Sequence, residues 1–267
     1  MLALVTAELH ARARSVAALA GGTFVLLLVL AGTYSAYGGE KALGKAFGSG
    51  HTPKLFSAFA GSSDANIFAP ASYLSFGFTH PLFLVLALAG AVTVGVGAVA
   101  GDVESGRAEL IYSLPVRRTL IFDARALAGA VAVITVVFAA VVGAEIGRLI
   151  SSDLSNVSVW VPVRVAIQLL PLLALFAAVA FTSSAISRTR GEAMGLAVAA
   201  PAAAYLANVV SLLWSKASFV GTLDPFHYFQ ATTAATAVNA WDVGGLAAAS
   251  IIVYLAGRSW IGRRDLA

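Results

Sequence analysis

Six long apolar stretches are the feature that most limits what this chain can fold into. A helix that crosses a bilayer needs roughly 20 mostly apolar residues. Of the 267 residues, 59% are hydrophobic and 11% are charged, whereas soluble domains have about 45–50% and about 25%. So few charged side chains cannot cover a surface exposed to water. We therefore predict an all-α integral membrane protein, one six-helix domain over residues 1–267, with spans at about 15–36, 79–100, 120–144, 165–187, 193–215 and 243–260.

The polar segment before the first span, residues 1–14, has the pattern of a helix that lies along the membrane surface. Glu8 and Arg12 are spaced as an i,i+4 ion pair. Another face carries three apolar side chains, Leu2, Val5 and Leu9. This amphipathic pattern predicts an N-terminal interfacial helix. A cleaved signal peptide fits less well, because the apolar run that follows exceeds the usual length of about 7–15 residues.

The basic residues predict the orientation. If the N-terminus is cytoplasmic, only six of the 17 basic residues face the other side: Lys41, Lys45, Lys54, Arg148, Arg164 and Lys216. Every short basic cluster then lies inside, as the positive-inside rule expects. Both termini are therefore predicted to be cytoplasmic, with residues 37–78 and 216–242 as the long extracellular segments.

The stretch Gly39–Ala46, GEKALGKA, matches the first seven positions of the phosphate-binding motif G-x-x-x-x-G-K-[ST]. The eighth position is Ala46, which lacks the hydroxyl group that holds Mg²⁺. The stretch also follows a predicted membrane helix and faces outside, where ATP is not available. A P-loop instead joins a buried strand to a helix. We therefore interpret this stretch as a flexible loop, not a nucleotide site.

The predicted spans carry no ionisable side chain near their middle. Ion-driven carriers usually need embedded ionisable groups, although sodium coupling through backbone carbonyls stays open. The chain has no Cys, and its four His residues are scattered, so no metal or thiolate site is predicted. The net charge of +4 favours anionic lipid as a partner over nucleic acid. Energy for transport would therefore come from another polypeptide.

The most polar connection between spans is the predicted cytoplasmic segment 101–119. Acidic residues near the start of a helix at Glu104–Ser113 suit its dipole, and Pro115 stops it. Leu110, Ile111 and Leu114 would form an apolar ridge. Such a short amphipathic helix suits docking into a groove on a cytoplasmic protein. The residue pattern alone leaves an ordinary connecting loop equally open.

The sequence from Gly101 to Gly129, GDVESGRAELIYSLPVRRTLIFDARALAG, resembles the signature stretch of type-2 ABC transporter permeases. The matching residues are Glu104, Ser105, Gly106, Glu109, Leu110, Ser113, Leu114, Pro115, Val116 and Arg118. Weaker similarity lies in Thr52–Leu74, like an external loop, and in Gly262–Leu266, like a closing basic segment. With six spans, the resemblance covers nearly the whole chain. Asp123 and Arg125 depart from the family pattern, and we expect Asp123 to snorkel or pair locally.

The resemblance implies a transporter of two permeases and two separate ATP-binding subunits. This chain would have no catalytic residue and no cofactor, and Mg-ATP would bind to the partner. The segment Glu104–Leu114 would be the coupling helix and residues 1–14 the elbow helix. The residues that would couple to the ATPase are Glu104, Ser105, Gly106, Arg107, Glu109, Leu110, Ser113, Leu114, Pro115 and Arg118. The second permease would be identical or paralogous, in the plasma membrane of a bacterium.

The extracellular segment 216–242 contains DPFHYF, Asp224 to Phe229. The resemblance suggests a re-entrant element near an extracellular gate, with Pro225, Phe226, Tyr228 and Phe229 as candidate gate residues. Taken singly, the aromatic side chains fit anchors in an interfacial aromatic belt better.

The function that we expect is one membrane half of an ATP-driven exporter. Spans without embedded charge fit amphiphilic or hydrophobic cargo such as a drug, antibiotic or lipid. Two other classes stay open: an ATP-independent secondary carrier and a non-transporting membrane scaffold that docks a cytoplasmic protein.

Overall fold

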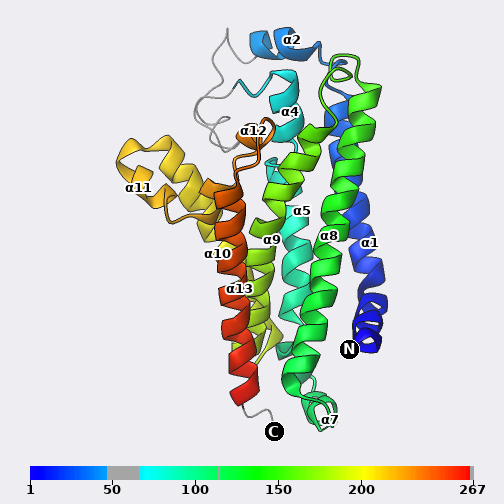
Figure 1. Ribbon diagram of the computed structural model, residues 1–267, viewed down its shortest axis with the longest axis vertical. Coiled ribbons are helices and arrows are strands. Elements are labelled where there is room, and N and C mark those ends of the chain that lie inside the picture. The colour runs from blue at the N-terminus through cyan, green and yellow to red at the C-terminus, as the bar shows by residue number, and fades with distance from the viewer. Residues whose placement is uncertain (47–65, 114, 265–267) are drawn as a thin grey trace.

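The computed structural model describes residues 1–46, 66–113 and 115–264. Within these ranges all regular secondary structure is helical, which confirms the all-α part of the predicted fold class. Long helices run side by side along the vertical axis of Figure 1, with both termini toward the end where α7 lies. The helices are α1 (Leu2–Gly32), α2 (Gly39–Ala46), α4 (Pro70–Phe76), α5 (Pro81–Val96), α6 (Ala100–Glu104), α7 (Ala108–Tyr112), α8 (Arg118–Ile150), α9 (Trp160–Ile186), α10 (Arg190–Leu213), η1 (Ser215–Ala217), α11 (Ser218–Gly221), η2 (Pro225–Tyr228), α12 (Ala231–Ala234) and α13 (Ala240–Arg263).

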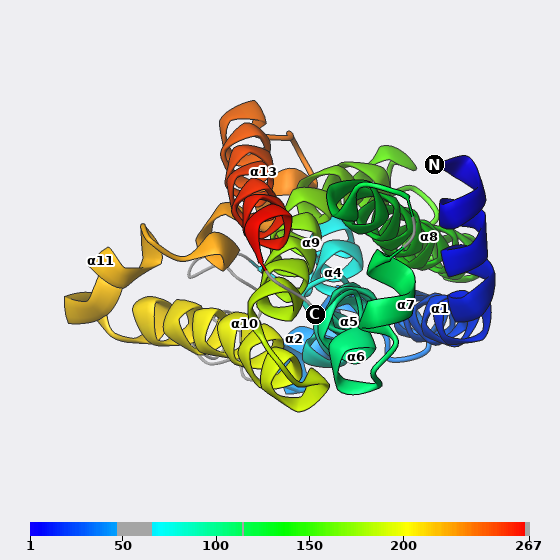
Figure 2. The same cartoon turned by 90° about the horizontal axis from the view of Figure 1, so that it is seen from below.

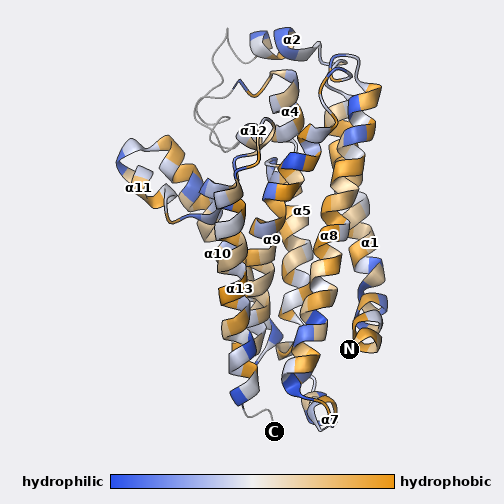
Figure 3. Cartoon of the chain, viewed as in Figure 1, coloured by the Kyte–Doolittle hydropathy of each residue, from blue (hydrophilic) through white to orange (hydrophobic). Residues whose placement is uncertain are grey.

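Five of these helices are long and apolar enough to cross a membrane: α1, α8, α9, α10 and α13. The pair α4 and α5 passes the same test together and is bent by 41°, so the number of candidate spans is five to six. In Figure 3 hydrophobic residues, in orange, predominate along the middle of the bundle, and hydrophilic residues, in blue, collect toward its two ends. This distribution is that of a multi-pass membrane protein.

The second predicted span, 79–100, corresponds to the helix α5, whose ends lie two and four residues inside the predicted bounds. The helix α5 covers only 16 residues, which is about 24 Å long. It begins at Pro81 because the residue before a proline disfavours the helical conformation. His80 caps this end, where its Nδ1 accepts a hydrogen bond from the backbone N–H of Leu82 at 3.3 Å. The part of segment 37–78 that lies in α4 is packed into the core through Leu74 and is not a surface loop.

The interpretation of residues 39–46 as a flexible loop is also wrong, because they form the helix α2. A tight turn precedes it, with φ of +82° at Gly38 and +61° at Gly39, a region that glycine enters without strain. Part of the predicted external loop, residues 47–65, and the C-terminal residues 265–267 lie outside the described residues. No strand precedes α2 in the described chain, so the P-loop geometry is not formed there.

The first helix is continuous where the sequence predicts two elements, residues 1–14 and 15–36. In Figure 2 its first turns run across the lower end of the molecule, while the remainder is seen nearly end-on. The predicted pair of Glu8 and Arg12 forms at 3.4 Å. Val5 is buried against Ala124 and Ala128 of α8, so these turns lie on the bundle.

Helix α9 is the centre of the bundle, with α13, α10, α5 and α8 around it in Figure 2. Glycines allow helices to pack closely at two contacts. A Cβ atom added at Gly143 of α8 would lie 2.2 Å from the carbonyl oxygen of Phe24 in α1, and one at Gly257 of α13 would lie 2.9 Å from Cα of Thr182 in α9. Small residues at such contacts let backbones approach in membrane bundles, where packing drives helix association.

Candidate functional site

The segment between α5 and α8 forms a compact projection at one end of the molecule, around α7 in Figure 1. The sequence predicts one helix from Glu104 to Ser113, and this is wrong, because two short helices, α6 and α7, occupy the region. Gly106 separates them with φ of +70°, a left-handed conformation that ends a helix. Leu114 lies outside the described residues.

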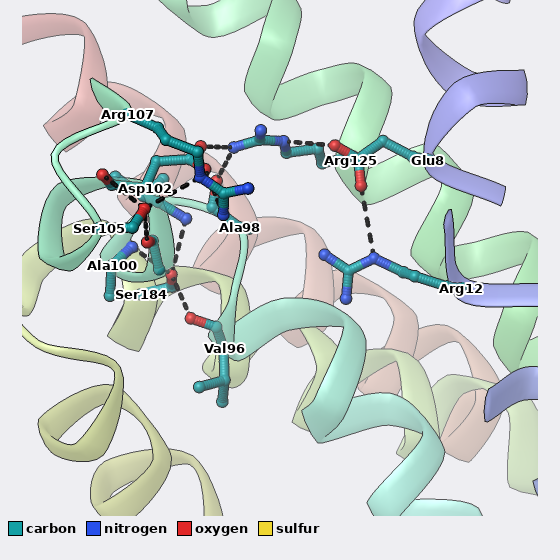
Figure 4. Close-up of polar contacts among 12 residues, drawn as sticks. Glu8, Arg12, Val96, Ala98, Ala100, Asp102, Ser105, Arg107, Arg125 and Ser184 are labelled. Carbon is teal, nitrogen blue, oxygen red and sulfur yellow. Dashed lines mark hydrogen bonds and ion pairs between the residues drawn. The ribbon is translucent and has the colours of Figure 1, made fainter. Parts of the chain in front are cut away.

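Ser184 of α9 holds the break between α5 and α6. Its hydroxyl oxygen accepts hydrogen bonds from the backbone N–H groups of Val99 at 2.9 Å and Ala100 at 3.0 Å. The same hydroxyl donates to the carbonyl of Val96 at 2.7 Å. All three partners are groups that a helix end leaves without an intrahelical bond. One buried side chain therefore fixes where the projection leaves the bundle (Figure 4).

Charged side chains tie α6 to the first turns of α1 and to α8. In Figure 4, Arg125 of α8 reaches both Asp102 and Glu8. Its Nη1 lies 2.5 Å from Oδ2 of Asp102, and its Nε lies 2.8 Å from Oε1 of Glu8. Arg125 also donates to the carbonyl of Ala98, and Arg107 approaches the other oxygen of Asp102 at 3.6 Å.

The central ion pair of this network, between Asp102 and Arg125, is buried. The side chains of Asp102 and Arg125 are only 5% and 11% exposed. A cavity of about 870 Å³ lies beside them, between α1, the α6–α7 projection and α8. Buried charges persist only when they are paired and hydrogen-bonded. The network therefore sets the position of α6 relative to two long helices.

Glu104 connects the projection to a third helix. Its Oε2 accepts a hydrogen bond from the backbone N–H of Arg190 at 2.7 Å, at the start of α10. A carboxylate suits a helix N-terminus, which carries partial positive charge. Thr189 caps the same helix by accepting from the N–H of Glu192 at 3.2 Å. The carboxylate of Glu104 thus faces α10 rather than pointing straight out.

Most of the other predicted coupling residues lie on the outer surface of the projection. The side chain of Leu110 is 74% exposed. Ala108 of the same helix is buried. Burial raises the pKa of the Tyr112 phenol, the last residue of α7, so this phenol stays uncharged. We call the exposed set the tip surface: Glu104, Ser105, Gly106, Arg107, Glu109, Leu110, Ser113 and Pro115.

Arg118 lies apart from the tip surface. It begins α8, and its Nη1 donates to the carbonyl of Arg264 at 2.6 Å. Arg264 in turn donates to the carbonyl of Ser187 at 2.8 Å. These two arginines join the ends of α8, α9 and α13.

Asp102 and Arg125 were not among the residues that the sequence singled out for coupling, although Arg125 was noted as a departure. The available signal was positional, since an acid follows the second apolar stretch and an arginine begins the third. Asp123 pairs as expected, but its partner is distant in sequence: Arg258 of α13 binds it through Nε at 2.8 Å and Nη2 at 3.0 Å.

The candidate gate residues lie at the opposite end from α7 and do not form one exposed surface. Phe226 is buried, with its ring centroid 5.5 Å from that of Phe176 and 5.5 Å from that of Tyr205. Phe229 is buried as well. The hydroxyl of Tyr228 donates to the carbonyl of Thr222 at 2.6 Å, and Pro225 starts η2.

Asp224 begins this turn from inside the protein. Its Oδ1 accepts from the backbone N–H of Phe226 at 2.8 Å. Burial raises the pKa of the Asp224 carboxyl to about 6, which the hydrogen bond from Phe226 and nearby His227 only partly offset. The segment Asp224–Phe229 is therefore a packed turn with aromatic side chains inserted between α9 and α10.

A comparison with known protein families gives a match over most of the chain. The family described as ABC-2 family transporter protein matches residues 2–235. No curated protein and no solved structure matches the chain. The family match covers the projection with its tip surface and all long helices of the bundle except α13. The chain therefore belongs to the ABC-2 family of transporter proteins, as the resemblance predicted, and is a non-catalytic membrane subunit of such a transporter.

Proposed function

We propose that this chain is the permease subunit of an ATP-driven exporter and that a separate ATP-binding subunit docks on its tip surface. The observation that carries the proposal is the combination of an exposed tip with a buried, ion-paired base. Leu110 is 74% exposed at the tip, while Asp102 is 3% exposed at the base. A surface that contacts a moving partner needs such a rigid connection to the helices that must move.

The base reaches several long helices at once. Arg125 links α6 to α1 and α8, Glu104 links it to α10, and Ser184 links it to α9. A push on the tip surface would therefore act on four helices rather than on one flexible loop. On this proposal the α7 end is cytoplasmic, six spans cross the plasma membrane of a bacterium, and the first turns of α1 are the elbow helix.

The assembly that we propose has two ATP-binding subunits, which hold Mg-ATP, and two permeases. The second permease is identical or paralogous. The cargo is amphiphilic or hydrophobic, and an apolar cavity of about 590 Å³ between α5 and α10 supports this. Tyr205 and Pro201 of α10 line that cavity, together with Leu84 and Val92 of α5. The packed turn at Asp224–Phe229 would close the outer end of the path.

The test is affinity purification of the tagged chain from its native membranes in mild detergent. We expect a P-loop ATPase to co-purify in equal amount with the permease. Leu110→Asp should remove the ATPase while the protein stays folded, because an aspartate opposes an apolar contact. Leu223→Asp is the matched control, since Leu223 is 83% exposed at the other end of the molecule.

The alternatives give different results. A secondary carrier would purify without an ATPase and would transport in ATP-free vesicles. A scaffold would retain a cytoplasmic partner through Leu110 but would show no ATP-dependent transport. Either result would overturn the proposal that this chain is part of an ATP-driven exporter.

A further inference from the structure

An apolar groove runs along the outside of the bundle between α8 and α13. Its volume is about 710 Å³. Small side chains form its floor and sides, among them Ala174 of α9 and Ala130 of α8. Larger apolar side chains form its rims, with Ile134 of α8 55% exposed and Ile251 of α13 56% exposed. The hollow exists because alanines lie where bulkier residues would fill the space between two helices.

The groove has one polar end, on the α7 side of the molecule. Asp123 of α8 lies there, held by Arg258 of α13 through a two-bond ion pair at 2.8 and 3.0 Å. The hydroxyl of Tyr254 donates to the same carboxylate. Arg258 lies five residues before the end of α13, which places it about 7.5 Å inside the end of the helix. A helix that ends at the outer edge of the headgroups would place this arginine near the boundary between headgroups and hydrocarbon, because the headgroup layer is about 5–7 Å thick.

Arg258 keeps hydrogen-bonding capacity that Asp123 does not use. Its side chain is 41% exposed. A guanidinium has five N–H donors, and two of them bind Asp123. Tyr254 also interacts with this guanidinium. Its exposed side still presents N–H donors at the mouth of the groove, where guanidinium geometry suits a phosphate.

The length of the groove matches one leaflet. Its lining extends along α9 from Leu170 to Phe181 and along α13 from Ala247 to Arg258. Eleven residues of helix rise about 16 Å, and half of a typical hydrocarbon core is about 15 Å. A single acyl chain that enters from the polar end would fill the groove along its length.

We propose that this groove is a binding site for one phospholipid of the leaflet on the α7 side, with an acyl chain in the groove and the phosphate on Arg258. Within a bilayer something must fill an apolar hollow. An apolar helix of a second protein would cover the exposed guanidinium of Arg258 without offering it a hydrogen-bond acceptor, which is costly within a membrane. This site does not depend on the ATP-binding partner.

The test is native mass spectrometry of the purified chain, titrated with phosphatidylglycerol or with diacylglycerol of the same acyl chains. We expect one bound phosphatidylglycerol per chain, at least about tenfold tighter than diacylglycerol, because hydrogen bonds to a charged group contribute about 1.5–3 kcal/mol. The double variant Asp123→Asn with Arg258→Gln keeps a polar pair but removes the charge. It should bind the two lipids equally.

A second variant tests the hollow itself. Ala174→Phe fills the floor and should weaken both lipids about tenfold or more, the effect of a lost apolar contact of this size. Ala199→Phe, on an exposed position of α10 outside the groove, is the matched control. In the unaltered chain, a photoactivatable phosphatidylglycerol should label residues of α8, α9 and α13 that line the groove.

Two results would overturn the proposal. One is photolabelling spread evenly over the bundle, with lipid binding by Ala174→Phe equal to that of the control. The other is efficient disulfide formation between two chains that carry Ile251→Cys, which is interpretable because the natural sequence has no Cys. That cross-link would show a second copy of the chain over the groove.

Discussion

Asp102 and Arg125 form a 2.5 Å ion pair between α6 and α8, and neither side chain is more than 11% exposed. Glu8 of α1 binds the same guanidinium at 2.8 Å. One arginine therefore holds together three helices at the base of the tip surface. Removing either partner should destabilise the fold, because the remaining buried charge would have lost its hydration without gaining a counter-charge.

The pair predicts a strong asymmetry between single and double variants. Arg125→Met should lower the stability of the purified protein by up to about 3–5 kcal/mol, since it leaves the buried Asp102 with only the exposed Arg107 at 3.6 Å as a counter-charge. Adding Asp102→Asn to Arg125→Met should recover much of that loss. Thermal unfolding in one detergent, followed by intrinsic fluorescence, measures both. Additive losses in the double variant would contradict the coupling.

Close packing of α1 on α8 gives the second prediction. A Cβ atom at Gly143 would meet the carbonyl of Phe24 at 2.2 Å, so Gly143→Ala forces the two helices apart. We expect a loss of about 1–3 kcal/mol, the usual range for overpacking. Gly195→Ala in α10 is the matched control, because nothing lies within 4 Å of the added atom. It should cause no loss, and equal effects of the two variants would refute the packing argument.

Sequence patterns located the long helices well because burial in lipid demands long apolar runs, and α8, α9, α10 and α13 include their predicted spans to within a few residues. The ends of the second span were harder to predict. Hydropathy stays high through residues 79–100, but Pro81 and Gly97 break the helix at both ends, and Ser184 satisfies the freed groups from a distant helix. Hydropathy does not report such long-range hydrogen bonds.

The base of the tip surface could not be predicted for a similar reason. Periodicity places Arg125 on α8 but does not say which acids it meets, because Glu8 and Asp102 come from two other elements. The exposed residues of the tip surface were easier. Pro115 and Gly106 act locally, and polar residues between two spans must reach water. Local chemistry was therefore visible, whereas contacts between elements were not.

The buried carboxyl of Asp224 predicts a dependence of stability on pH. Burial raises its pKa from 3.8 to about 6, so the folded protein keeps this proton at pH values where the unfolded chain has released it. Stability contributed by Asp224 therefore falls as pH rises from about 4 to about 6 and is constant above that.

Asp224→Asn should remove this component of the pH profile. The amide still accepts from the N–H of Phe226, so the turn is kept and the variant should be the more stable protein at pH 7, by up to about 3 kcal/mol. Asp153→Asn, at an exposed position in the turn after α8, is the control and should keep the profile of the natural protein. Melting temperatures between pH 4 and 8 decide, and identical profiles for the Asp224 variant and the natural protein would exclude the effect.

Ser184 gives the last prediction, which concerns the link between the bundle and the tip surface. Ser184→Ala leaves the N–H groups of Val99 and Ala100 buried without their acceptor, at a cost of about 1–3 kcal/mol for each group. Ser75→Ala is the matched control. Ser75 is equally buried, but its hydroxyl donates to the carbonyl of Ala71, which lies one turn earlier in the same helix, α4. Hydrogen exchange should therefore rise at residues 97–107 in Ser184→Ala and stay unchanged there in Ser75→Ala.

Because α6 would then move independently of α9, Ser184→Ala should also reduce ATP-dependent transport more than it reduces the amount of bound ATPase. Unchanged exchange at residues 97–107 would show that the serine does not hold the α6 end of the projection.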